Sequence, residues 1–249
     1  MYLDVQELSD FYHSHLGLVA RHLLAHRIRA LWPDVHHENV LGIGFAAPFM
    51  RPFLAEARRV FLAMPEQQGA IRWPHDAPSR TFLTSDMQLP LADASVNKVL
   101  AVHCLEGCNA ANALLREIWR VLAPEGKLLL IVPNRRGLWA RFDTTPLGQG
   151  HPYSRGQLGR LLAECLFDIA GWSSGLFMPP LNWRIVLKTA VAVERVGLYA
   201  WPGFSGVLMV EAQKQLYAPV GRQAPAKASL RTAGAASHSA AQTTQHERK

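Results

Sequence analysis

Apolar residues in the first thirty positions recur every three or four residues, with histidines and arginines between them. This spacing is typical of an amphipathic helix that packs on a core along one face. A glycine interrupts the pattern at Gly17, where we expect the helix to break. We therefore predict an N-terminal helical segment over residues 1–32. Its apolar positions are Leu8, Tyr12, Leu16, Val19, Leu23, Leu24, Ile28 and Leu31.

Short apolar runs then alternate with helical patterns. The apolar residues in these runs are consecutive, as in strands that are buried on both faces of a parallel sheet. The alternation predicts an α/β fold with a doubly wound, mostly parallel sheet. The expected strands are 39–44, 60–63, 81–83, 96–102 and 127–132, and the expected helices are 49–57 and 110–122.

The pattern changes after Pro133 and ends near Val220. We expect a helix over 154–166, a strand over 167–173, a helix over 185–199 and an extended run that starts near residue 206. The last two strands are expected to pair as an antiparallel hairpin around the helical insertion. From residue 220 on, the sequence holds too few large apolar side chains to offset the entropy of ordering. We predict one domain over 1–219 and a disordered tail over 220–249.

The composition of the chain limits the classes of function that it can have. The chain has 249 residues, of which 49% are hydrophobic and 18% charged, enough for one ordinary core. Its formal charge is +7, but four of these charges lie in residues 220–249, so the rest of the chain does not predict a nucleic-acid interface. No apolar run is long enough to span a membrane, no secretory signal is recognisable, and the three cysteines follow no disulfide spacing. A cytoplasmic location is expected.

A glycine turn follows the strand at 39–44. The segment 42–47, GIGFAA, formally matches the dinucleotide-binding fingerprint with alanine in the last place. Glycines at such a corner let backbone N–H groups approach a ligand closely. Two alternatives stay open for this segment alone: a tight strand-to-helix corner without a ligand, and an NAD(P)-dependent oxidoreductase. The acidic residue that would hold a ribose at the end of the next strand is missing, because that strand ends at Ala63 and Met64.

Three later blocks point to one family. They read SDMQLPLADASVNKVL at 85–100, HCLE at 103–106 and LREIWRVLAPEGKLLL at 115–130. Together they resemble the class I S-adenosylmethionine-dependent methyltransferases over roughly residues 40–134. The resemblance implies a Rossmann-like sheet of seven strands with an antiparallel last strand, an N-terminal helical cap and S-adenosylmethionine as the cofactor. It also implies a cofactor site built from Gly42, Gly44, Phe45, Ala46, Asp86, Met87 and His103.

The glycine motif departs from the family pattern. Gly42 stands at the usual acidic position, and Ala46 and Pro48 replace two of three glycines. Where a ligand hydroxyl has no charged partner, the missing hydrogen bond weakens binding by about one to two decades. A non-catalytic binding or regulatory protein with the same fold is therefore the main alternative to an enzyme.

The residue types at the strand ends offer few candidates for a catalytic role. Methyl transfer is an in-line displacement, for which positioning of the nucleophile supplies most of the help. His103 is the candidate general base, with a purely pocket-lining role as the alternative. Asp86 would accept a hydrogen bond from the adenine amino group or only stabilise its loop, and Glu106 is read as a turn or cap carboxylate. We expect no metal site, because ligand-type residues near residue 104 lack a second pair at ligand spacing.

Residues 133–204 combine arginines with aromatic side chains and are expected to form part of a cap. This composition favours a small substrate that is apolar with a polar or anionic end. The aromatic residues could instead belong to the core or to a docking surface. The residues concerned are Arg135, Arg136, Arg141, His151, Tyr153, Trp172, Phe177, Trp183, Trp201 and Phe204. The sequence as a whole predicts an S-adenosylmethionine-dependent methyltransferase that acts on a small molecule.

Overall fold

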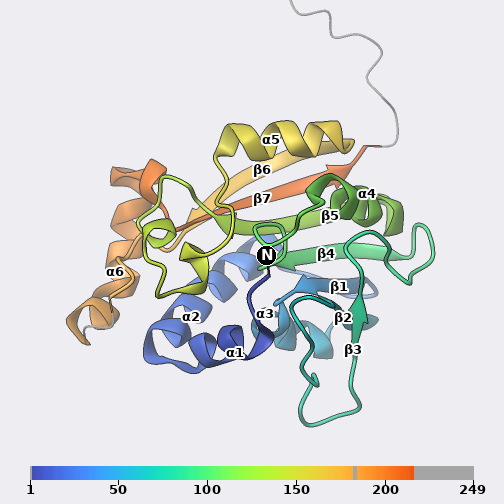
Figure 1. Ribbon diagram of the computed structural model, residues 1–249, viewed down its shortest axis with the longest axis horizontal. Coiled ribbons are helices and arrows are strands. Elements are labelled where there is room, and N and C mark those ends of the chain that lie inside the picture. The colour runs from blue at the N-terminus through green and yellow to red at the C-terminus, as the bar shows by residue number, and fades with distance from the viewer. Residues whose placement is uncertain (1, 182–183, 216–249) are drawn as a thin grey trace, which may run out of the picture. The chain divides into compact units, whose positions relative to one another are not determined.

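The computed structural model describes residues 2–181 and 184–215 (Figure 1). These residues form a seven-stranded sheet in the order β3-β2-β1-β4-β5-β7-β6. β7 is antiparallel to both of its neighbours, and the other pairs are parallel. This confirms the predicted sheet. The strands are β1 (Asn39–Gly44), β2 (Arg59–Pro65), β3 (Thr81–Thr84), β4 (Val96–Val102), β5 (Leu122–Pro133), β6 (Phe167–Gly175) and β7 (Val207–Lys214).

Helices cover both faces of the sheet and bury a separate core on each face. Along β1, Val40 faces one core and Leu41 and Ile43 face the other, as the alternation of a strand requires. The first core includes side chains of α1 to α3, and the second includes those of α4 and α5. The helices are α1 (Val5–His13), α2 (His15–Leu31), α3 (Ala47–Met50), α4 (Ala111–Val121), α5 (Arg155–Glu164) and α6 (Arg184–Ala200).

The leading helix breaks at Ser14, not at Gly17 as predicted. Ser14 has an extended backbone, and its Oγ accepts a hydrogen bond from the Gly17 N–H at 3.1 Å, which caps the start of α2. Gly17 instead allows the two helices to meet, because a Cβ there would lie 1.8 Å from the Phe11 carbonyl oxygen. The signal for the break was therefore the capping serine.

The helix predicted over 49–57 is also shorter than expected. α3 ends at Met50, and a 3-10 turn, η1 (Arg51–Ala55), follows it. Pro48 suits the first turn of α3, but Pro52 has no N–H with which to continue an α-helical ladder. The described residues after η1 contain three further 3-10 turns: η2 (Trp139–Arg141), η3 (Pro146–Gly148) and η4 (Pro202–Phe204).

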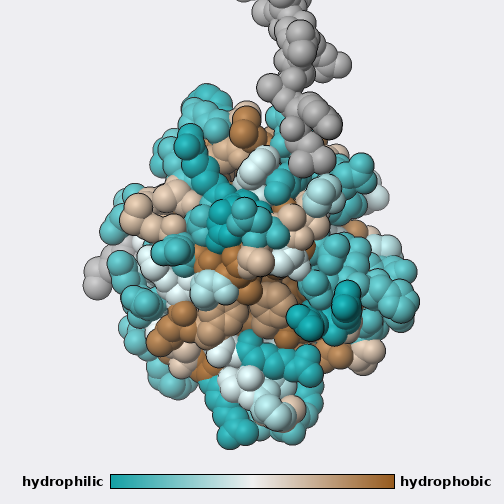
Figure 2. Space-filling model, turned by 90° about the vertical axis from the view of Figure 1, so that its right-hand side faces the viewer, coloured by the Kyte–Doolittle hydropathy of each residue, from teal (hydrophilic) through white to brown (hydrophobic). Residues whose placement is uncertain are grey.

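The connections on either side of β3 contain no helix over residues 66–80 and 85–95. The Phe61 and Phe82 rings, 6.5 Å apart, are consequently only half-buried. Figure 2 looks at the side of the molecule that lies on the right of Figure 1, and it shows apolar residues at the centre of this side within a hydrophilic surround.

Among the described residues, no helix is long and apolar enough to cross a bilayer. The tail predicted to be disordered, 220–249, lies outside the described residues, so it and the domain boundary at 219 stay predictions.

Candidate functional site

Four parallel strands end at one edge of the sheet and bring the predicted site residues together. Phe45 follows β1, Glu66 follows β2, Asp86 comes two residues after β3, and His103 follows β4. In open α/β sheets, ligands bind at this carboxyl edge. The structure therefore brings these residues to one edge of the sheet, where the sequence analysis expects a site.

The two glycines of the turn serve the packing of the chain itself. Gly44 has a φ of +70°, and a Cβ there would lie 2.3 Å from the Val102 carbonyl oxygen at the end of β4. At Gly42, a Cβ would lie 2.5 Å from Leu62 and 2.9 Å from the Ala46 Cβ. Both positions exclude a side chain because neighbouring strands and α3 approach closely. The space of an acidic residue at position 42 is thus already filled.

Aromatic rings occupy the region in front of this turn. Phe45 is 2% exposed and stacks on Tyr12 of α1, with ring centroids 5.8 Å apart and an interplanar angle of 19°. Ala46 is fully buried. The structure therefore places Phe45 and Ala46, two of the residues predicted to bind the cofactor, inside the first core.

His103 is the centre of a buried hydrogen-bonded chain. Its Nε2 lies 2.8 Å from the Tyr12 hydroxyl, and its Nδ1 lies 3.1 Å from Glu106 Oε1. Its backbone has a φ of +51°, and its carbonyl oxygen accepts a hydrogen bond from Gln68 Nε2 at 2.8 Å. All four side chains are at least nine-tenths buried. Glu106 is therefore a partner of the imidazole, a role that the sequence did not indicate.

Burial sets the protonation of Tyr12 in this hydrogen-bonded chain. Burial, together with the charge of Glu106, raises the pKa of Tyr12 far above its usual value, so its hydroxyl stays protonated. A carboxylate at Glu106 accepts from Nδ1–H of His103, which leaves Nε2 as the acceptor for Tyr12. The other carboxylate oxygen, Glu106 Oε2, is buried without a hydrogen-bond partner among the described residues. The network is therefore incomplete at Glu106.

A second polar pair closes the β3 end of the site. The Tyr2 hydroxyl donates a hydrogen bond to Asp86 Oδ1 at 2.7 Å, and burial raises the pKa of Tyr2 strongly. The Tyr2 ring lies against Gly107, where a Cβ would be 2.8 Å from a ring carbon. Val5, at the start of α1, donates its N–H to the Gln68 carbonyl oxygen at 2.8 Å. The N-terminal residues are thus fixed across the carboxyl edge.

Beside Asp86 a small cavity remains open. It has a volume of about 230 Å³, and Met87, also predicted to contact the cofactor, lines it with an exposed side chain. Binding pockets for small molecules usually have volumes of about 300–1,000 Å³, so this cavity holds part of a nucleoside cofactor at most. Its other lining residues are Pro65, Glu66, Gln67, Thr84, Ser85, Asp86, Asn109 and Ala110.

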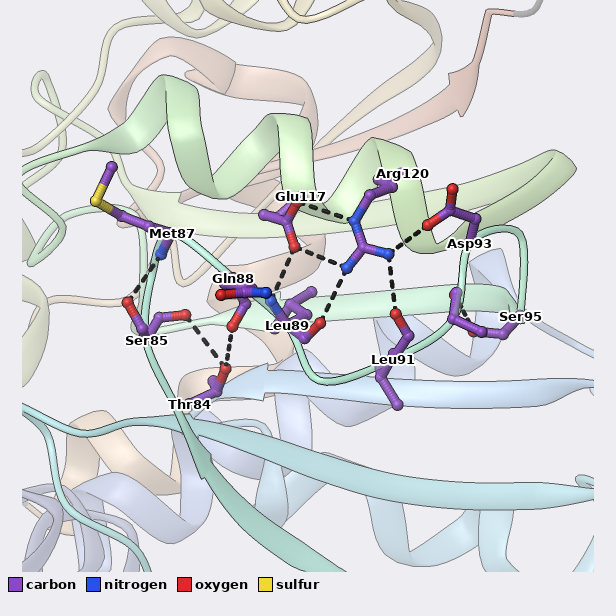
Figure 3. A network of polar contacts seen from close by, with 11 residues as sticks. Thr84, Ser85, Met87, Gln88, Leu89, Leu91, Asp93, Ser95, Glu117 and Arg120 are labelled. Carbon is purple, nitrogen blue, oxygen red and sulfur yellow. Dashed lines mark hydrogen bonds and ion pairs between the residues drawn. The ribbon is translucent and has the colours of Figure 1, made fainter.

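Charged residues of α4 fix the loop that carries Asp86 (Figure 3). Arg120 donates to the carbonyl oxygens of Leu89 and Leu91, at 2.9 Å each, and forms a salt bridge with Glu117 at 2.8 Å. Glu117 accepts the Leu89 N–H at 2.9 Å. Hydrogen bonds from Arg120 hold the pKa of Glu117 below its usual value. The charged residues of the third sequence block therefore hold the loop formed by the first block.

On the far side of α1 lies a larger cleft of about 720 Å³. Two carboxylates of α1, Glu7 and Asp10, line it together with apolar side chains. None of the arginines predicted to meet an anionic substrate lines this cleft; Arg136 instead borders a separate cavity of about 430 Å³. The remaining lining residues are Leu3, Phe11, Ser14, Leu16, Phe142, Thr144, Thr145, Pro146, Gln149, Pro180 and Leu181.

The aromatic residues of 133–204 divide between core and surface. Phe177 is buried, and Trp172 is half-buried with the Arg155 guanidinium 4.8 Å from its ring centre. Trp201 and Phe204 are exposed. Trp183 lies outside the described residues. A substrate cap made of these rings is therefore not assembled as one surface.

Comparison with known proteins defines the class. Residues 42–130 match the family model described as a methyltransferase domain. No curated protein matches the sequence. Over these residues the chain is similar to a methyltransferase domain, in agreement with the family resemblance, which implies S-adenosylmethionine as the cofactor.

Solved structures share this fold at low identity. An S-adenosylmethionine-dependent methyltransferase from Thermotoga maritima is 14% identical with a TM-score of 0.58, covering 85% of this chain and 96% of its own. A methyltransferase in complex with the activator Trm112 from Haloferax volcanii is 15% identical with a TM-score of 0.60, covering 86% and 98%. The cyclase SpnF is 19% identical with a TM-score of 0.51, covering 78% and 80%. The fold therefore occurs in proteins with different reactions.

The residues fit the family cofactor at one end only. The cavity beside Asp86 and Glu66 offers carboxylates to the hydroxyl and amino groups of an adenosyl moiety. Beside the glycine turn, the rings of Tyr12 and Phe45 are buried and stack on each other. As described, the site is closed to the whole cofactor.

Proposed function

We propose that this protein transfers a methyl group from S-adenosylmethionine to a small molecule that binds in the cleft beside α1. The observation that supports this most directly is the shared edge: the cavity at Asp86 and the imidazole of His103 both lie where parallel strands end, and α1, which contacts His103 through Tyr12, borders the cleft. When bound, the cofactor supplies an electrophilic methyl group, and the chain positions the acceptor for in-line attack.

The cleft favours one type of substrate. Its apolar side chains suit an aromatic or aliphatic body, while Glu7 and Asp10 would repel an anion and attract a cation. The described structure contains no ion pair to either carboxylate. We therefore favour a polar end that is neutral or positively charged over the anionic end suggested by the arginines.

His103 is suited to remove a proton from an acceptor that starts protonated. Glu106 fixes the ring orientation and would stabilise the imidazolium that forms. The nitrogen that would take the proton, Nε2, is hydrogen-bonded to Tyr12 in the described structure. His103 can therefore serve as a base only when Tyr12 has moved away.

Calorimetry and an activity screen test this function. We expect S-adenosylmethionine and S-adenosylhomocysteine to bind, and small amines or phenols to be methylated faster than carboxylic acids of similar size. Mass spectrometry of the purified protein should also reveal a co-purifying nucleoside. An absence of heat with millimolar cofactor would remove the enzyme interpretation.

A non-catalytic role is the second candidate. The closed region at Tyr12 and Phe45, and the glycine motif with only one of its usual three glycines, favour it. Cofactor binding without turnover of any acceptor class would support a binding or regulatory protein. An oxidoreductase would require binding of a nicotinamide nucleotide, which the same calorimetric measurement tests.

A further inference from the structure

On the basis of the proposed function, we propose that residues 2–14 are a displaceable cover over the site. The hydroxyls of Tyr2 and Tyr12 are hydrogen-bonded to Asp86 and His103 until the cofactor binds and displaces them. The cover consists of the extended N-terminal residues and α1. It contacts the site at both ends, through Tyr2 and Tyr12.

The first contact competes for the group expected to recognise adenosine. Asp86 is half-buried, and one of its oxygens is bound by Tyr2 at 2.7 Å. A carboxylate can accept several hydrogen bonds, but the ring of Tyr2 also covers Gly107. Departure of Tyr2 would free Asp86 and enlarge the 230 Å³ cavity on that side.

The second contact competes for the centre of the site. The Tyr12 hydroxyl is hydrogen-bonded to Nε2 of His103, and the Tyr12 ring stacks on the Phe45 ring. Departure of Tyr12 would therefore expose Nε2 of the imidazole and the space beside the glycine turn in one movement. It would also remove the partition between His103 and the 720 Å³ cleft, because α1 lies between them.

The fold permits this movement. α1 and α2 meet at Ser14, a single residue of extended backbone. Its Oγ accepts the Gly17 N–H, so α2 keeps its own cap when α1 moves, and its N–H and Oγ donate to carbonyl oxygens of α1, so Ser14 ends one helix and begins the other. The opposite side of α1 borders the cleft through Glu7 and Asp10, which leaves room there, and Phe11 packs edge-on against Trp139 with ring centroids 6.5 Å apart. A hinge between the helices and room on the far side are the two features that a mobile cover needs.

Population arithmetic predicts the effect of weakening the cover. The apparent dissociation constant equals the intrinsic constant divided by the open fraction. Loss of one hydrogen bond that exists only in the closed state shifts this equilibrium by about fivefold. Tyr2→Phe and Tyr12→Phe should therefore each tighten cofactor binding by about fivefold, and the double variant by about 25-fold if the two contacts act independently.

The experiment combines calorimetry with hydrogen exchange, using S-adenosylhomocysteine and the full chain. Tyr199→Phe is the matched control, because Tyr199 is 86% exposed. We expect tighter binding for both cover variants, no change for Tyr199→Phe, and faster exchange of amides in residues 2–14 when the ligand is bound to the wild type.

The possible outcomes distinguish a failure of the cover inference from a failure of the proposed function. If the wild type binds and residues 2–14 become protected, with unchanged affinity in both variants, the cover is a fixed wall and the inference is wrong. If neither wild type nor variants bind at millimolar concentration, the proposed function fails and no ligand displaces the cover. Faster exchange of residues 2–14 in Tyr12→Phe without ligand would then still show that the tyrosine holds the segment closed.

Discussion

The two ends of the candidate site differ in what fills them. At the end of β3, polar groups surround an open cavity, and the loop that carries Asp86 is fixed from behind by Arg120. At the end of β1, the glycine turn faces Phe45 and Tyr12, and the polar groups there are the buried partners of His103. The first end has the character of a preformed binding site. The second has the character of a core that must open.

The strongest test of the closed end concerns its chemistry. His103→Ala should lower the rate of methyl transfer by about 10²–10⁴-fold, because the base and its orienting carboxylate act together. In the Tyr12→Phe background, where the contact between Tyr12 and His103 is already absent, affinity for the cofactor should change little, as measured by calorimetry. Glu106→Gln should reduce the rate less, since it keeps a hydrogen bond to Nδ1 but removes the charge. A loss of cofactor binding in His103→Ala would instead make the imidazole a pocket residue.

A test of packing addresses the glycine turn at the same end. Gly44→Ala should lower the free energy of unfolding by about 3 kcal/mol, because the new Cβ clashes with β4 and the left-handed backbone disfavours a side chain. Gly156→Ala is the control, since no atom lies within 4 Å of a Cβ there. Urea denaturation measures both. Similar stability of the two variants would show that the turn is looser than described.

At the open end, the decisive residue is Asp86. Asp86→Asn should weaken cofactor binding by about 10- to 100-fold, the value of a charge-assisted hydrogen bond to a ligand. The same substitution weakens the contact with Tyr2, which acts in the opposite direction. Measuring Asp86→Asn in the Tyr2→Phe background removes this second effect. Unchanged affinity in that background would mean that Asp86 only stabilises its loop.

The sequence predicted the open end better than the closed one. Strands 39–44 and 96–102 were recognisable because buried parallel strands have continuous apolar runs, and the "Leu-Pro" block located Asp86. Tyr12 was assigned to a core-facing helix position, but periodicity does not reveal which group a side chain contacts across the fold. The contact of Tyr2 with Gly107 joins residues over a hundred positions apart, and local patterns carry no information on such a pair.

The smallest expected effect concerns the contacts by which Glu117 and Arg120 hold the loop that carries Asp86. Glu117→Gln should lower the free energy of unfolding by about 1 kcal/mol at pH 7, because neutral hydrogen bonds to Arg120 replace charge-assisted ones. Since the folded state lowers the pKa of Glu117, its contribution is complete above the unfolded value of about 4.3 and is lost as the pH falls through the folded value. The wild type and Glu117→Gln should therefore become equally stable in acid. A constant difference between their denaturation midpoints from pH 7 to pH 3 would show that packing, and not charge, makes Arg120 hold the loop.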